Sequence, residues 1–262
     1  MLTEGIKVIN YHQDSKTRFW INSGTKLATE MVNYHPDAYI PKNSWRELNN
    51  EEKRLITEIT GEPDRSLHIG IVKLPKQILT LFTQAGVGLI NSPQDCQRIS
   101  QQPVYIQAME RLAEYILPLS LDDDSLVCRG IYLNPPGLAT VTWDQQANKY
   151  IGLHFDSWDR LPIEERHLSS NRICINLGKE DRYLLFINLS VLAIWSLLQI
   201  NTINSLKNAF LQAYPDYPVI KVRISPGEAY IAPTENIIHD GCSLDRYSCD
   251  LHLTIRGHLR LP

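Results

Sequence analysis

The stretch IGLHFDSW places a histidine and an aspartate, His154 and Asp156, two residues apart at the end of an apolar run. Imidazole nitrogens and carboxylate oxygens are common ligands of transition-metal ions. Residues two apart on a β-strand point to the same face, so both side chains could reach one ion from one side. The spacing therefore predicts a metal site, provided that residues 150–155 form a strand.

The His-x-Asp pattern by itself is weak evidence, because residues 12–14 (HQD) and 35–37 (HPD) repeat it. Proline interrupts a strand at 35–37, and residues 12–14 lie far from the β-rich half of the chain. At residues 154–156, Phe155 can pack on the opposite face, and Gly152 can leave room beside the two ligands. Ordinary explanations stay open, since Asp156 could cap a turn and His154 could be a hydrogen-bonded core residue.

A third candidate ligand, His239, ends a short apolar run within the segment PGEAYIAPTENIIHDG. Turn residues stand on both sides of this run, at 226–227 and 240–241, which indicates a short strand. A histidine at the end of such a strand can meet ligands on an opposing strand. Taken alone, His239 is better explained as a buried or surface histidine near a turn.

The segment DLHLTIRGHL alternates apolar and polar residues over 250–259, as a strand with one buried face does. If the apolar face packs against a helical layer, Arg256 points into the β-structure, where a buried guanidinium needs an anionic partner. A bound carboxylate is such a partner, because the guanidinium grips it through two parallel hydrogen bonds. A strand with one wet face and a solvated Arg256 is the alternative.

In this order the four residues resemble the motif of the Fe(II)/2-oxoglutarate-dependent oxygenases: His154, Asp156, His239 and Arg256. That family has a double-stranded β-helix (jelly-roll) core and a His-x-Asp…His iron triad. The resemblance covers roughly residues 126–260, and it implies that the two histidines and Asp156 bind Fe(II) and are catalytic. It also implies that Arg256 binds the distal carboxylate of 2-oxoglutarate. Arg246 competes for this role, because it follows His239 more closely.

The resemblance assigns further residues around the iron. The expected cosubstrate-binding residues besides Arg256 are Thr254, Asn134 and Tyr132. The expected substrate-binding residues are Trp158, which could wall the pocket, and two residues that the 172–176 strand sends inward, Arg172 and Asn176. A carboxylate at Asp156 favours hydroxylation, desaturation or cyclisation, because related halogenases carry a small residue at that position.

The implied activity is hydroxylation of an unactivated C–H bond of a small molecule, amino acid or peptide, with O2 and 2-oxoglutarate consumed and succinate and CO2 released. A cupin-type metal barrel is a rival, although such barrels usually carry a His-x-His pair, which this chain lacks. A non-catalytic β-barrel with accidental histidines is another. A serine hydrolase lacks support, because there is no Gly-x-Ser-x-Gly motif.

The elements that must position these residues divide the chain in two. Capping and spacing predict helices at 49–59, 75–85, 103–117 and within 190–214. Short β-rich runs separated by turn residues follow residue 118, at 126–133, 140–143, 150–155, 172–177, 183–189, 219–224, 229–232 and 250–259. We therefore expect an α+β protein. Residues 1–120 would form a mainly helical support region, packed on a jelly-roll catalytic core at 121–262 in one compact domain.

Composition narrows the class further. The 262 residues are 43% hydrophobic and 21% charged, which allows a packed core, and the net charge is -3. A chain without a basic excess is a poor candidate for binding nucleic acid or an anionic membrane, and no long apolar run or leader is evident. Its five cysteines include no CxxC pair, so we expect free thiols and a cytoplasmic location.

Overall fold

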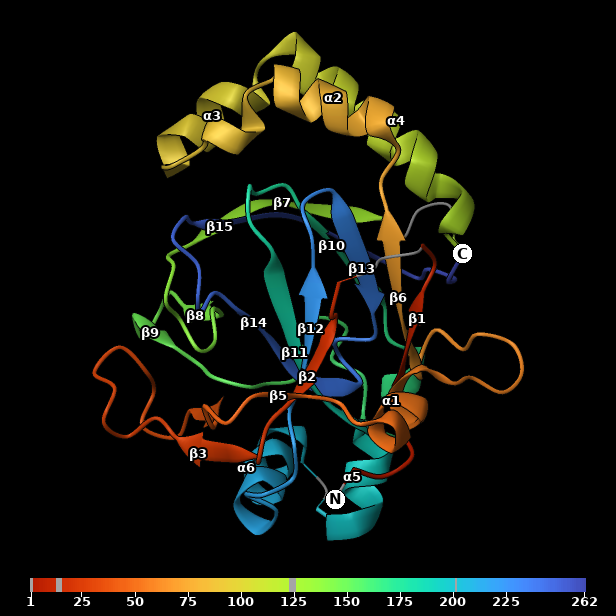
Figure 1. Ribbon diagram of the computed structural model, residues 1–262, viewed down its shortest axis with the longest axis vertical. Helices are drawn as coiled ribbons and strands as arrows, with labels where there is room; N and C mark the ends of the chain where they lie inside the picture. Colours follow the sequence, from red (N-terminus) through yellow and green to blue (C-terminus); the bar gives the residue numbers. More distant parts are fainter. Residues whose placement is uncertain (1, 13–15, 123–125, 201) are drawn as a thin grey trace.

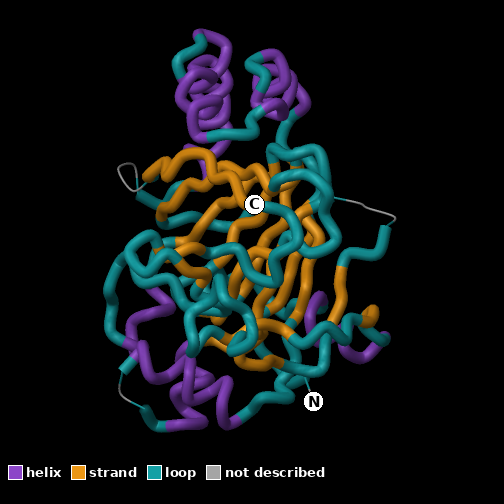
Figure 2. Tube along the Cα trace, turned by 90° about the vertical axis from the view of Figure 1, so that its left-hand side faces the viewer, coloured by secondary structure: helices purple, strands orange, loops and turns teal. Residues whose placement is uncertain are grey.

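The computed structural model describes residues 2–12, 16–122, 126–200 and 202–262. Two main β-sheets pack together at the centre, and helices cover the outer face of each sheet (Figure 1). Figure 2 shows the same order from the side, with helices at both ends and strands between them. The expectation of a mixed α+β protein is confirmed. Among the described residues, no helix is long and apolar enough to span a bilayer.

The first sheet has six strands, in the order β1 (Lys7–Asn10), β6 (His68–Lys73), β13 (Glu228–Ala232), β10 (Asn171–Asn176), β15 (Asp250–Gly257) and β7 (Val127–Asn134). The second has five, in the order β14 (Ile237–Cys242), β11 (Arg182–Ser190), β12 (Ile220–Ile224), β2 (Phe19–Ile21) and β5 (Arg46–Glu47). Two small ladders join β3 (Thr25–Leu27) to β4 (Tyr39–Pro41) and β8 (Trp143–Asp144) to β9 (Lys149–Tyr150). Only β1 and β6 pair in parallel among these ladders of the described chain.

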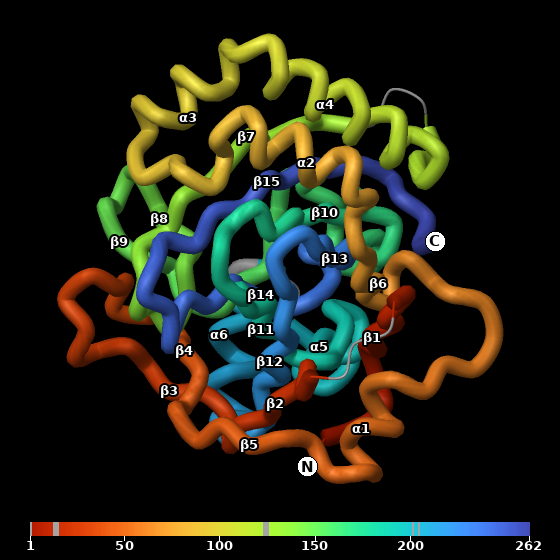
Figure 3. The backbone as a smooth tube through the Cα atoms, turned by 45° about the horizontal axis from the view of Figure 1, so that its top comes forward, coloured from red at the N-terminus to blue at the C-terminus, as the bar shows by residue number. Residues whose placement is uncertain are grey.

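The helices are α1 (Asn50–Thr57), α2 (Lys76–Gln84), α3 (Pro93–Ser100), α4 (Pro103–Ile116), α5 (Val191–Leu198) and α6 (Ile203–Ala213), with short 3-10 turns η1 (Val87–Leu89), η2 (Leu117–Leu119) and η3 (Ile163–Leu168). Figure 3 shows α2, α3 and α4 as an arch over β7, β15 and β10. Side chains of α2 and α4 share a core with Leu251, Leu253 and Ile255 of β15. The apolar face of β15 therefore packs against a helical layer, as its alternation predicts.

Local sequence explains where the predicted helices begin and end. Asn49 and Glu52 form a capping box at the start of α1, satisfying amides that have no partner within the helix. Gly86 follows α2 with a φ of +76°, the left-handed conformation in which glycine commonly ends a helix. The helices predicted at 49–59, 75–85 and 103–117 are confirmed, and α3 is an additional helix that begins with Pro93 after the cap Ser92.

The expectation that residues 1–120 are mainly helical is wrong for the segment before α2. Six strands lie there, and four of them extend the two sheets: β1 and β6 join the first beside β13, and β2 and β5 join the second beside β12. These strands have two to six residues, too few for a clear alternating pattern. They form because a neighbouring strand satisfies their backbone groups, which is information that no local window contains.

The strand expected at 150–155 is also shorter than predicted. Only Lys149–Tyr150 belongs to β9, and beyond it His154 forms an isolated antiparallel bridge with His239. Gly152 has a φ of +74°, and a Cβ placed on it would lie 2.5 Å from the carbonyl oxygen of Tyr39. The glycine therefore allows a close backbone contact that breaks the strand, and it does not leave space beside the ligands as expected.

Buried ion pairs connect the two sheets across their interface. Arg182 of β11 donates from Nε to Oδ1 of Asp250 in β15 at 3.0 Å, and both residues are at most 2% exposed. Arg18, just before β2, donates two hydrogen bonds to Glu228 of β13, at 2.8 and 3.0 Å. A buried charge whose partner is removed is strongly destabilising. Any shift of one sheet that separated these pairs would therefore be costly, so the pairs fix the relative position of the sheets. The five cysteines are free, as expected.

Replacing Asp250 by asparagine is expected to lower the free energy of unfolding at pH 7 by about 3–5 kcal/mol, because Arg182 loses its counter-charge. Burial raises the pKa of Asp250, but Arg182 and His252 outweigh it, so the folded-state pKa is lowered. The stabilisation is therefore present above the unfolded pKa of about 3.9 and lost as the pH falls further. Urea unfolding should show the difference between the two proteins shrinking below about pH 4.

The matched control is Glu110→Gln, which removes one exposed carboxylate on α4 and should change stability by less than about 0.5 kcal/mol. If D250N is as stable as the original chain at pH 7, the Arg182–Asp250 pair does not stabilise the sheet contact.

Candidate metal centre

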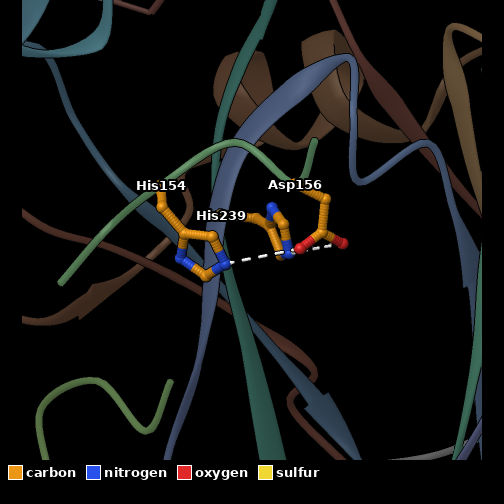
Figure 4. A group of neighbouring side chains, drawn as sticks. All are labelled: His154, Asp156 and His239. Atoms are coloured by element: carbon orange, nitrogen blue, oxygen red, sulfur yellow. Dashed lines mark ion pairs between the residues drawn. The ribbon is translucent and has the colours of Figure 1, made fainter. Parts of the chain in front are cut away.

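His154, Asp156 and His239 lie together in the folded chain and point toward one another (Figure 4). One potential ligand atom from each residue lies within 4.8 Å of the other two. His154 Nε2 is 3.5 Å from Asp156 Oδ1, and His239 Nε2 is 3.8 Å from Asp156 Oδ2. The three residues are 8%, 6% and 1% exposed, respectively. The predicted triad is therefore a buried cluster of two imidazoles and one carboxylate.

Backbone hydrogen bonds position the two histidines opposite each other. The amide of His154 donates to the carbonyl of His239 at 3.0 Å, and the amide of His239 donates back at 2.8 Å. Residues that exchange both bonds in an antiparallel pair place their side chains on the same face. The two imidazole centroids are 4.7 Å apart as a result. Asp156 is held beside them because its amide donates to the carbonyl of Thr234.

Each imidazole uses its Nδ1 on the backbone. Nδ1 of His154 is 3.1 Å from the carbonyl oxygen of Gly152, and Nδ1 of His239 is 3.3 Å from that of Ile237. An Nδ1–H donor to a carbonyl leaves the lone pair on Nε2, which is the arrangement that a metal-binding histidine needs. Asp240 Oδ2 also lies 3.5 Å from Nδ1 of His154 and reinforces this orientation.

Two polar atoms of the triad, Nε2 of His239 and Oδ2 of Asp156, are buried without a hydrogen-bond partner. Buried polar groups rarely lack a hydrogen-bond partner, so these two atoms indicate that a ligand binds between the side chains. Oδ2 of Asp156 does lie 2.7 Å from a guanidinium nitrogen of Arg172, which supplies charge without hydrogen-bond geometry. Two imidazoles and one carboxylate are the donor set of non-heme Fe(II) centres, so the residues present fit that ion.

The protonation of the cluster follows from its charges. Burial lowers the pKa of His154, but the carboxylates of Asp156 and Asp240 outweigh it and raise the pKa to about 9. Burial lowers the pKa of His239. The charges of His154 and Arg172 lower it as well, and the nearby carboxylates raise it less, so the pKa is about 4. Burial also opposes the charge of Asp156, yet Arg172 and the histidines hold its pKa well below the usual range. At neutral pH these shifts favour a cationic His154 and a neutral His239 in the metal-free cluster.

The triad opens onto a cavity of about 750 Å³ between the two sheets. Residues that the sequence analysis singled out also line it: Tyr132, Asn134, Trp158, Arg172, Thr254 and Arg256. Asn134 donates to Asp250 at 3.0 Å, and the ring of Tyr132 stacks on His252 at 5.5 Å. Thr254 Oγ1 lies 3.9 Å from Cys174 Sγ. The strands thus bring these side chains to one wall of the cavity.

Arg256 points inward as predicted, but carboxylates of the protein itself pair with its guanidinium. Its guanidinium hydrogen-bonds to Glu235, which is fully buried, and to Asp159 at 3.1 Å. Glu235 also accepts the backbone amides of Trp158 and Asp159, both at 3.0 Å. Arg166 closes the network with a hydrogen bond to the carbonyl of Asp156 at 2.8 Å. This set of charges fixes the loop that follows the ligand Asp156.

Two predicted or competing residues lie elsewhere. Asn176, which was expected to bind substrate, does not line this cavity: its side-chain amide donates to the carbonyls of Ile224 and Glu180 and accepts from the amide of Gly178. It is on the inward face of β10, but at the far end, where it closes the turn to β11. Arg246 does not line the cavity, because its guanidinium is bound to the carbonyls of Asp181 and Cys249.

Within the part of the chain that the structure describes, the other His-x-Asp patterns contribute no residue to a cluster of metal ligands. The His35 imidazole lies 3.4 Å from Asp144, whereas Asp37 accepts a hydrogen bond from Asn208. His12 is 3.0 Å from Glu228, whereas residues 13–15 lie outside the described residues. The His-x-Asp spacing therefore indicates a metal site only where the tertiary structure supplies a third ligand.

Four residues of the site were not singled out from the sequence: Asp240, Glu235, Arg166 and Asp159. Asp240 directly follows His239, and Glu235 lies in the polar Thr234-Glu235-Asn236 turn. A charged residue inside a turn usually faces water, so only the observed burial shows that Glu235 and Arg166 are partners. The sequence offered one signal for these residues, adjacency to a candidate ligand, and only Asp240 is adjacent to one.

No family model and no curated protein matches the chain. Two crystal structures of the Kdo hydroxylase KdoO, a non-heme Fe(II) alphaketoglutarate-dependent dioxygenase, are similar to it. The cobalt(II) complex aligns with a TM-score of 0.43, and the complex with succinate and Fe(III) with 0.41. Each alignment has 12% sequence identity and covers 74% of this chain and 80% of the other. A likeness this distant carries no argument about activity, which must come from the side chains.

Replacing Asp156 by alanine is expected to weaken Co(II) binding by more than about 100-fold, because the only carboxylate of the donor set is lost. Isothermal titration with Co(II) measures this directly. His35→Ala is the matched control, since it removes a histidine from another His-x-Asp pattern and should bind Co(II) as the original chain does. Unchanged affinity in D156A would show that the triad is not the metal site.

Metal affinity is expected to increase with pH up to about 9. Below that pH His154 carries a proton that must leave before Nε2 can bind an ion, so each lower pH unit costs up to about tenfold in affinity. Titrations between pH 6 and 9, in buffers of different ionisation enthalpy, report the released proton. An affinity that does not change over this interval would contradict a protonated His154.

Proposed function

We propose that this protein is an Fe(II)- and 2-oxoglutarate-dependent oxygenase that hydroxylates an unactivated C–H bond of a small molecule, amino acid or short peptide. O2 is the second cosubstrate, and succinate and CO2 are the co-products. The observation that carries the proposal is the triad: ligand atoms of His154, Asp156 and His239 lie within 4.8 Å, buried, on a cavity of about 750 Å³.

The strand order supports a jelly-roll core around this site. β7, β15, β10 and β13 are neighbours in the first sheet, while β14, β11 and β12 are neighbours in the second. The bridge between His154 and His239 adds the segment near residue 154 beside β14. With that segment counted in the second sheet, the successive strands of these two sheets from β7 to β15 alternate between them, except that β11 and β12 are neighbours in the second sheet, and this winding is typical of a jelly roll. We accordingly propose residues 121–262 as the catalytic core and residues 1–120 as its support.

The bound iron and 2-oxoglutarate would supply the oxidising chemistry, with 2-oxoglutarate decarboxylated to succinate as oxygen is inserted into the substrate. The chain's own residues hold and orient these reactants. His154 and His239 present Nε2 because their Nδ1 atoms are engaged by carbonyls, and Arg172 holds one oxygen of Asp156. Three protein ligands on one side leave the opposite side open to reactants.

We propose Arg172 as the arginine that receives a carboxylate of 2-oxoglutarate, in place of Arg256. The two residues are cross-strand partners on β10 and β15, and both line the cavity. Glu235 and Asp159 already satisfy Arg256. Among the described residues, Arg172 has one ionic partner, the ligand Asp156, whereas Arg256 has two. Thr254, Asn134 and Tyr132 line the same cavity and remain proposed cosubstrate contacts.

A reducing, cytoplasmic setting is part of the proposal, and the free state of all five cysteines supports it.

The protein reconstituted with Fe(II) is expected to release succinate from 2-oxoglutarate only when O2 is present, slowly without substrate and faster with it. Asp156→Ala should abolish the release, and His35→Ala should leave it unchanged. Mass spectrometry of the succinate formed measures the turnover. Tight metal binding without any O2-dependent succinate would instead support a non-catalytic or cupin-type metal protein.

Arg172→Ala and Arg256→Ala are expected to fail in different ways. Loss of Arg172 should raise the KM for 2-oxoglutarate at least about tenfold, because a charge-assisted pair is removed. Loss of Arg256 should chiefly weaken Co(II) binding and alter the visible spectrum of bound Co(II), since the loop beyond Asp156 loses its anchor. A raised KM in R256A with the Co(II) spectrum unchanged would restore Arg256 as the 2-oxoglutarate anchor.

A further inference from the structure

One arginine at the exposed side of the metal cavity has no anionic partner. Arg129 is exposed and lines the cavity together with Asp156 and His239. Within the described part of the chain it makes no hydrogen bond and no ion pair. The other arginines around the site, Arg172, Arg256 and Arg166, are each paired with a carboxylate. The guanidinium of Arg129 is therefore available to pair with an anion from outside the chain.

The backbone of β7 directs this side chain. β7 is the edge strand of the first sheet, and its pairing with β15 shifts between Gly130, opposite Thr254, and Cys128, opposite Ile255. Arg129 is the extra residue of this β-bulge, and Gly130 has a φ of +91°, which favours glycine. A bulge interrupts the regular alternation of side chains along a strand and so changes the direction of one of them. Bulges are common beside active sites.

Trp158 holds the guanidinium in place. The Cζ atom of Arg129 is 4.1 Å from the centroid of the Trp158 ring, within the range of a cation–π contact. Trp158 comes two residues after the ligand Asp156, and the buried Glu235 fixes its backbone amide. A guanidinium over an aromatic ring keeps the N–H donors at its edge, and these fit an oxoanion through two hydrogen bonds.

We propose that Arg129, held by Trp158, binds an oxoanion of the substrate, so that the substrate is a small molecule carrying a carboxylate or a phosphate. This inference rests on the proposed function, since it takes the cavity as the substrate site. Tyr132 and Trp143 are each 41% exposed and line the same cavity, where they offer apolar surface next to the anion. The carboxylates that line it, Asp156 and Asp240, face the histidines and do not compete for Arg129.

The test measures binding of three ring probes, benzoate, phenyl phosphate and benzamide, to the protein loaded with Ni(II) and 2-oxoglutarate without O2. Isothermal titration should show at least one anion binding about tenfold or more tightly than the neutral amide. The anion that binds more tightly identifies the carboxylate or the phosphate. Arg129→Gln should remove the preference.

Arg160→Gln is the matched control, because it removes the same charge from an exposed residue near Trp158 that does not line the cavity. It should keep the preference for anions. Equal binding of anions and amide by the original chain, including no binding by any probe, would overturn the proposal, as would a preference that survives in R129Q or disappears in R160Q.

Two further measurements separate the possible failures. Co(II) binding by R129Q reports whether the metal centre is intact, so a lost preference with Co(II) affinity unchanged assigns the effect to Arg129. Succinate release by the original chain tests the oxygenase proposal on its own. An anion preference without succinate release would refute the oxygenase and keep the anion site, and succinate release without an anion preference would do the reverse.

Discussion

Two reciprocal backbone hydrogen bonds between His154 and His239 are the constraint on which the site depends. They join segments far apart in the chain and place both imidazoles on one face, with centroids 4.7 Å apart. The same geometry directs each Nδ1 to a nearby carbonyl and each Nε2 toward Asp156. Because the bonds are between main-chain atoms, many sequences could make them. The identity of the two side chains is what turns a strand pairing into a candidate metal centre.

Several carboxylates near this pairing are buried, and the fold must neutralise their charge. Asp156, Glu235 and Asp250 are buried carboxylates, and each lies against an arginine: Arg172, Arg256 or Arg182. A carboxylate without such a partner would take up a proton or destabilise the fold. The pairs hold the loop after Asp156 and join the sheets at the same time. Arg129 departs from this pattern, and its position on the cavity is why a ligand is the expected partner.

The N-terminal part contributes to the site indirectly. Its strands lengthen both sheets, and α2 and α4 cover the apolar face of β15. With Leu251, Leu253 and Ile255 packed outward, His252, Thr254 and Arg256 must face the cavity, since successive residues of a strand alternate. The backbone of Tyr39 also packs against Gly152, two residues before His154. The N-terminal helices thus determine which face of β15 lines the cavity.

The sequence alone determined what depends on neighbours along the chain. A capping box located α1, a flanking proline and glycine located α2, and apolar spacing located α4. Alternation assigned the two faces of β15, and ligand types in order predicted the triad. Only the tertiary structure decided which carboxylate meets Arg256, that Asn176 closes a turn, that residues before α2 form strands, and that Arg129 lies on Trp158. Helix ends and strand faces follow from bonds within a few residues. Partners of buried charges and of short strands come from distant segments, whose meeting depends on packing the whole chain.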